Sequence, residues 1–145
     1  MSKYANGFYS LINPEKYVGK KTPHYRSGWE HTFMRFCDTN PSVLQWASEP
    51  LRIPYINPAT NKHTTYVPDF LIIYENKAKE KICELIEIKP SGQTSIHMAG
   101  KSKINKVHAI INEAKWKAAA LWAKNNNINF RILTENELFK NNKNK

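Results

Sequence analysis

The sequence contains no long run of apolar residues, and no stretch approaches the roughly 20 that a membrane-spanning helix requires. Residues 1–6 also lack the apolar segment of a signal peptide, so we expect a protein that acts in the cytoplasm without a membrane. Cysteine is scarce, since Cys37 and Cys83 are the only two. Two isolated thiols provide neither a disulfide framework nor a zinc site, and we expect both to pack as small apolar side chains.

Acidic residues are outnumbered: 12 Asp and Glu stand against 22 Lys and Arg, which gives a formal net charge of +10. Such a chain favours polyanionic partners, and nucleic acid is the first candidate. Basic charge also improves solubility without such a partner, so the charge indicates a class of ligand and no more. A length of 145 residues with 41% apolar content fits one domain with a hydrophobic core.

The composition changes along the chain and predicts three regions. Residues 1–24 carry glycine and proline among aromatic residues, which predicts an irregular arm packed on the domain by its rings. Residues 25–140 form the folded domain. Residues 141–145 are only asparagine and lysine, which is typical of a disordered tail.

The folded region is predicted to contain a helix, three strands, a second helix and a fourth strand. Ser27 and Glu30 form a capping box that begins the first helix, and Pro41 follows its end. The remaining elements follow from apolar periodicity: strands at 51–56, 64–74 and 81–89, a long helix from about 104 to 125, a strand at 128–133 and a short helix opened by a capping box at 134–137. The fold class is therefore α/β, with a mixed β-sheet flanked by helices.

Strand 64–74 carries a carboxylate among apolar residues. Side chains alternate between the two faces of a strand, so Asp69 shares a face with Val67 and Leu71. A carboxylate in such surroundings requires a partner or a cation. The alternative is an aspartate satisfied by a turn or by a salt bridge, and a Pro68-Asp69 dipeptide alone does not distinguish the two.

Strand 81–89 carries the second group of charged residues. Glu87 and Lys89 are two residues apart and share one face, whereas Glu84 projects from the other. If this strand pairs with its predecessor, Asp69 and Glu87 converge. An exposed cross-strand charge pair would look the same locally, but this strand has apolar residues on both faces.

Converging carboxylates repel each other, and a divalent cation relieves that repulsion. Oxygen ligands of this kind suit Mg²⁺ or Mn²⁺, with the backbone carbonyl of Ile88 as a further candidate ligand beside Asp69 and Glu87. A metal there activates water and polarises phosphate, and Lys89 orients the water or stabilises the developing charge. These parts together predict phosphodiester hydrolysis.

The motif Pro68-Asp69 followed by Glu87-Ile88-Lys89 resembles the signature of the PD-(D/E)xK nuclease superfamily. The predicted order of elements is similar to the restriction-endonuclease-like core of that superfamily. Many members carry a glutamate on the first helix, and Glu30 matches that position, as in TnsA-like and phage junction-resolving nucleases. The resemblance implies a catalytic set of Glu30, Asp69, Glu87 and Lys89, although the capping box alone also explains Glu30.

A closer resemblance covers most of the chain. Segments 13–19, 25–30, 67–70, 86–90 and 114–119 are similar to those of the head completion nucleases of contractile-tailed phages. This implies a Mg²⁺-dependent deoxyribonuclease that acts on packaged DNA in the host cytoplasm, before the head joins the tail. It also implies phage head or neck proteins as partners and a place in the virion, with no small-molecule cofactor.

The basic residues nearest these motifs are the candidates for DNA contact: Arg26, Lys101, Lys103 and Lys106. A solvated helix face explains the lysines equally well, and nothing indicates base readout, so we expect little sequence specificity. Three alternatives stay open. They are a non-catalytic protein that caps DNA ends or the head vertex, a structural neck protein and a junction resolvase.

Overall fold

The computed structural model describes residues 6–91 and 103–138, with side chains in the second range from residue 106 onward. Its elements in chain order are β1 (Gly7–Phe8), the 3-10 turn η1 (Pro14–Lys16), β2 (His24–Tyr25), α1 (Gly28–Thr39), β3 (Val43–Ser48), β4 (Ile53–Asn57), β5 (Lys62–Tyr66), β6 (Phe70–Glu75), β7 (Lys81–Ile88), α2 (Lys103–Asn125) and β8 (Asn129–Leu133). Within these ranges, no helix has the length and apolar character needed to cross a membrane.

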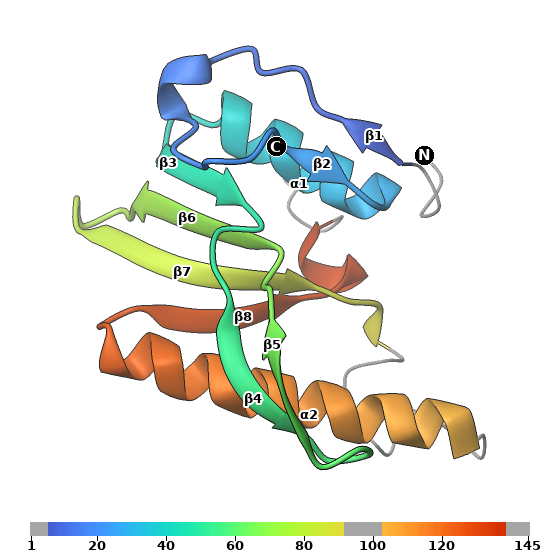
Figure 1. The fold of residues 1–145 in the computed structure, drawn as a ribbon. Helices are drawn as coiled ribbons and strands as arrows, with labels where there is room; N and C mark the ends of the chain where they lie inside the picture. Colours follow the sequence, from blue (N-terminus) through green and yellow to red (C-terminus); the bar gives the residue numbers. More distant parts are fainter. Residues whose placement is uncertain (1–5, 92–102, 139–145) are drawn as a thin grey trace.

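The central sheet has the strand order β3-β6-β7-β8 (Figure 1). The pairs β3–β6 and β6–β7 are antiparallel, whereas β8 lies parallel to β7. A parallel neighbour requires a crossover connection, and α2 lies on the path between β7 and β8. The prediction of an α/β fold with a mixed sheet is confirmed.

The helices cover opposite faces of this sheet, with α1 on one side and α2 on the other (Figure 1). The core on the α1 side includes Phe33, Met34, Phe70 and Ile86. On the α2 side, the hairpin of β4 and β5 joins the helix, and the core includes Tyr66 and Leu85. Residues 85 and 86 of β7 thus face different cores, as strand alternation requires.

Helix α1 begins and ends where the sequence predicts. The Ser27 hydroxyl accepts a hydrogen bond from the Glu30 N–H at 3.2 Å, and the Glu30 carboxylate accepts one from the Ser27 hydroxyl at 3.2 Å. Asn40 is the C-cap, in extended conformation. The second capping box also forms, because Glu137 accepts from both the backbone and the hydroxyl of Thr134.

The strand predictions need two corrections. The first strand of the central sheet is β3, which the sequence analysis missed, whereas the predicted strand 51–56 corresponds to β4 in a separate hairpin. The predicted strand 64–74 is interrupted at residues 67–69 and forms β5 and β6. Pro68 lacks the N–H that a continuous ladder needs, and the chain bends there.

The described part of the N-terminal arm is anchored by the buried carboxylate of Asp38, which is 0% exposed. Asp38 accepts hydrogen bonds from the Tyr9 hydroxyl (2.8 Å), the Ile12 N–H (2.7 Å) and the Asn13 N–H (2.9 Å). The arm also contributes β1 and β2, which pair with each other. The division into an arm, a domain and a tail stays a prediction, and residues 139–145 lie outside the described residues.

Candidate active site

The register of β6 and β7 brings Asp69 and Glu87 together. Phe70 pairs with Ile86 in this antiparallel register. The residue before Phe70, Asp69, therefore lies beside the residue after Ile86, Glu87. The Ile88 N–H donates a hydrogen bond to Asp69 Oδ2 at 2.8 Å, which fixes this carboxylate against the end of β7. The sequence analysis placed Asp69 inside a continuous strand, whereas it lies in a bend just before β6.

Glu87 is held from two sides and is only 6% exposed. The Tyr66 hydroxyl donates a hydrogen bond to Oε1 at 2.6 Å. Lys89 Nζ lies 4.0 Å from Oε2, as expected for two residues on one face of a strand. One oxygen of each carboxylate, Asp69 Oδ2 and Glu87 Oε1, is therefore engaged by a hydrogen bond.

Glu30 serves the helix cap and also acts electrostatically on the other two carboxylates. Its negative charge raises the pKa of both Asp69 and Glu87. The neighbouring Glu49 lies at the same edge, because its N–H donates to the Asp69 carbonyl at 2.8 Å. Glu49 is paired with Arg26 at 3.0 Å, so it is the less available of the two glutamates for chemistry.

All three carboxylates have raised pKa values. For Asp69, burial raises the pKa most, followed by the charges of Glu87 and Glu30, while the Ile88 N–H and Lys89 partly offset the rise. Burial is also the largest cause for Glu87 and for Glu30. A bound cation would stabilise the ionised forms of such a cluster of like charges.

The donor set fits a hard divalent cation. Mg²⁺ is typically held by one or two carboxylates and keeps several water ligands, and Asp69 and Glu87 are two such carboxylates. A complete protein cage is not formed: within the described ranges, no group of three or more His, Cys, Asp or Glu residues is arranged to hold a metal. Glu30 therefore belongs to the cluster by charge without being shown as a ligand.

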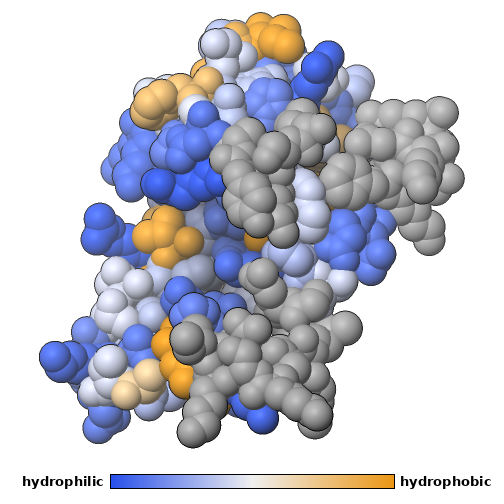
Figure 2. Space-filling view, turned by 90° about the vertical axis from the view of Figure 1, so that its right-hand side faces the viewer, coloured by the Kyte–Doolittle hydropathy of each residue, from blue (hydrophilic) through white to orange (hydrophobic). Residues whose placement is uncertain are grey.

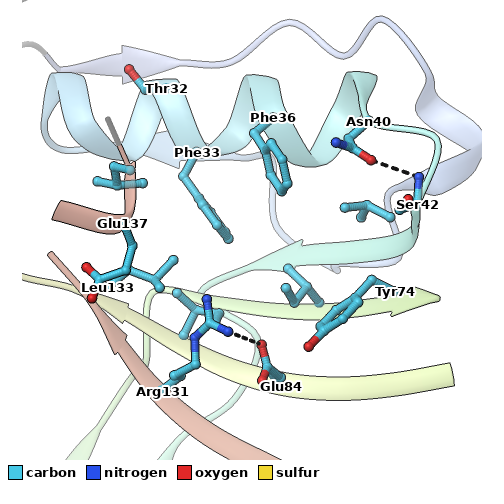
Figure 3. Close-up of a pocket in the computed structure, with 14 residues that line it drawn as sticks. Thr32, Phe33, Phe36, Asn40, Ser42, Tyr74, Glu84, Arg131, Leu133 and Glu137 are labelled. Carbon is cyan, nitrogen blue, oxygen red and sulfur yellow. Dashed lines mark hydrogen bonds and ion pairs between the residues drawn. The ribbon is translucent and has the colours of Figure 1, made fainter. Parts of the chain in front are cut away.

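Glu84 belongs to the other face of the sheet, as the alternation in β7 predicts. It is 5% exposed and lies 3.6 Å from Arg131 Nη1 (Figure 3). Together they line a cavity of about 260 Å³ between α1 and the sheet, next to Phe33 and Tyr74. Asp69, Glu87 and Lys89 do not line this cavity, so the two buried glutamates of β7 serve different environments.

The structure describes the side chains of two of the four candidates for DNA contact. Arg26 is exposed and paired with Glu49, and Lys106 is exposed on α2. Lys101 and the side chain of Lys103 lie outside the described residues. Figure 2 views the molecule from the side toward which β7 runs, and the described residues on this face are mainly hydrophilic, with separate apolar patches.

Two residues that the sequence analysis did not single out adjoin the site. Tyr66 at the end of β5 binds Glu87, and Lys115 of α2 lies over the Tyr66 ring, with its Nζ 5.8 Å from the ring centre. The positive charge of Lys115 lowers the pKa of Glu87. Both contacts are tertiary, between segments far apart in the chain, so no local spacing indicates them.

The fold agrees with comparisons to known proteins. The family described as TnsA-like endonuclease N terminal matches residues 40–135, a range that contains Asp69, Glu87 and Lys89. The chain belongs to this family of PD-(D/E)xK-like nucleases, with a restriction-endonuclease-like fold. The head completion nuclease of Enterobacteria phage T4 is 36% identical over 136 residues, which cover 87% of this chain and 88% of that protein. The resemblance noted from the sequence is confirmed.

Proposed function

We propose that this protein is a metal-dependent deoxyribonuclease that hydrolyses phosphodiester bonds in packaged phage DNA during head completion, before head and tail join. The observation that carries the proposal is the meeting of Asp69 and Glu87, with Lys89 beside them, in a member of a nuclease family. The T4 relative, named a head completion nuclease, supports the biological role.

Each residue of the site has an assigned role. Asp69 and Glu87 would hold Mg²⁺, or Mn²⁺ in its place, together with the Ile88 carbonyl. When bound, the metal lowers the pKa of a water ligand and polarises a phosphate oxygen. Lys89 orients the attacking water and offsets the charge that develops on the phosphorus oxygens.

Glu30 assists by accepting a proton from the attacking water. Its raised pKa supports this role, because a proton acceptor is most effective when its pKa lies nearer the working pH. Arg26, Lys101, Lys103 and Lys106 contact phosphates, and phosphate contacts carry no sequence information. We therefore infer little sequence preference. From the head completion role we also infer action in the host cytoplasm or within the virion, and contact with phage head or neck proteins.

The first test is cleavage of linear and supercoiled DNA in the presence of Mg²⁺, Mn²⁺ or EDTA. The wild type should cleave with either metal and be inactive in EDTA, whereas Lys89→Ala should lose at least about 100-fold in rate, as removal of one charge-stabilising donor typically does. Folded wild type that binds DNA without cutting any substrate would instead support a capping protein. Cleavage that persists in EDTA would contradict the metal requirement.

A further inference from the structure

Lys115 of α2 lies over the ring of Tyr66, and the hydroxyl of Tyr66 donates a hydrogen bond to Glu87. Lys115 lies one helical turn before Ala119, which packs in the core cluster that contains Tyr66. Its Nζ is 5.8 Å from the centre of the Tyr66 ring, and its charge acts on Glu87. Helix α2, strand β5 and strand β7 thus each contribute one side chain to this group, namely Lys115, Tyr66 and Glu87.

Lys115 is a cation without an anionic partner in the part of the chain that the structure describes. No carboxylate of residues 6–91 or 106–138 lies within 4.0 Å of its Nζ, although Lys117, two positions further along α2, is paired with Glu113 at 3.0 Å. Lys117 is exposed, whereas Lys115 is partly buried over the Tyr66 ring. The ammonium group thus lies over the face of an aromatic ring, with no carboxylate of the described side chains paired to it.

We propose that Lys115 is a phosphate-binding residue of the active site, and that Tyr66 is a positioning residue which holds both Lys115 and Glu87 in place. This inference rests on the proposed nuclease function. Lys89 Nζ lies 4.0 Å from Glu87 Oε2, and Lys115 lies over the ring of Tyr66, whose hydroxyl binds Glu87 Oε1. A DNA phosphate brought to Glu87 therefore comes near two cations, and lysine binds phosphate as a point charge.

The hydroxyl of Tyr66 has a separate task. Its hydrogen bond occupies Glu87 Oε1 and leaves Oε2 directed to the side of Lys89. A carboxylate ligand fixed in this way binds a metal better than a freely rotating one, and loss of such a supporting contact typically costs about 10- to 100-fold in metal affinity. Tyr66 thus acts on the metal site, and Lys115 acts on the DNA.

The test for Lys115 compares Lys115→Gln with Lys117→Gln, because glutamine keeps part of the stem and removes the charge. DNA binding is measured in EDTA over a range of salt, and cleavage is measured in Mg²⁺. Lys115→Gln should lower the log-log salt slope by about 0.9 and reduce kcat/KM about tenfold or more, while Lys117→Gln should leave both unchanged. Lys115→Arg should recover most of the affinity. Equal behaviour of the two glutamine variants would overturn the assignment.

The test for Tyr66 is the Mg²⁺ dependence of cleavage by Tyr66→Phe, with Tyr55→Phe on the neighbouring strand β4 as control. The half-saturating Mg²⁺ concentration should rise about tenfold or more in Tyr66→Phe alone. An unchanged concentration in a folded variant would refute the positioning role. If the wild type cleaves no DNA, the proposed function fails; the salt slopes of the lysine variants then still decide whether Lys115 binds phosphate, and Mg²⁺ binding measured by calorimetry decides the role of Tyr66.

Discussion

Replacement of Asp69 by asparagine is expected to stabilise the metal-free protein while it abolishes cleavage. Asparagine keeps a side-chain oxygen that accepts from the Ile88 N–H, the 2.8 Å bond that fixes residue 69. It removes a charge whose ionised form is disfavoured by burial, by Glu87 and by Glu30. Under the proposed function, the native aspartate is thus expected to serve catalysis at the expense of stability.

The size of the effect follows from the charges around Asp69. Two like charges about 5 Å apart at an effective dielectric constant near 20 repel by about 3 kcal/mol. Lys89 attracts Asp69 and removes part of this cost. We expect a net gain of about 1 to 2 kcal/mol for Asp69→Asn, which corresponds to a rise in Tm of roughly 3 to 8 °C for a chain of this size.

The stabilisation by Asp69→Asn should increase with pH. Because the folded-state pKa of Asp69 lies above the unfolded value of about 3.9, the carboxyl favours the folded state at low pH. That contribution is lost as the pH rises through the folded-state pKa. The difference in Tm between Asp69→Asn and wild type in EDTA should therefore be small near pH 4 and increase toward pH 7.5.

Thermal unfolding in EDTA and in Mg²⁺ provides the assay. With Mg²⁺ at ten times its Kd, the wild type should gain about 1.4 kcal/mol by mass action, while Asp69→Asn should gain much less. A lower Tm for Asp69→Asn in EDTA at pH 7.5, together with no effect of Mg²⁺ on the wild type, would refute this reasoning.

Three further predictions concern residues around the site and the arm. Glu30→Gln keeps the cap on α1, so cleavage should fall at least about tenfold with Tm changed by less than about 2 °C; full activity would remove Glu30 from the catalytic set. Asp38→Ala leaves the donors of Tyr9, Ile12 and Asn13 without an acceptor. It should lower the free energy of unfolding, measured by chemical denaturation, by about 3 kcal/mol or more, while the cleavage rate per folded molecule stays the same. Lys106→Ala should weaken DNA binding equally for unrelated sequences; a loss confined to one sequence would contradict a phosphate contact.

The elements with strong local signals are the ones that the sequence predicts well. The capping boxes at Ser27 and Thr134 mark helix starts, and α2 shows apolar residues at helical spacing. Strand β3 has no such signal, because most of its residues are buried on both faces and do not alternate. The break at Pro68 needs the sheet as context, since proline is also tolerated at the start of a strand.

The residues of the candidate site also differ in how well the sequence predicts them. Glu87 and Lys89 follow from their spacing on one strand, and Asp69 joins them through strand pairing. Tyr66 and Lys115 depend on how the β4–β5 hairpin and α2 pack on the sheet. Neither contact can be read from local periodicity, because each links segments that are 20 or more residues apart.

The most direct test of the site uses the two buried glutamates of β7 as a matched pair. Glu87 and Glu84 are three residues apart on one strand but face opposite sides of the sheet. Mg²⁺-dependent DNA cleavage should be lost in Glu87→Gln and kept, per folded molecule, in Glu84→Gln. Full cleavage by Glu87→Gln, or its loss only in Glu84→Gln, would contradict an active site formed by Asp69, Glu87 and Lys89.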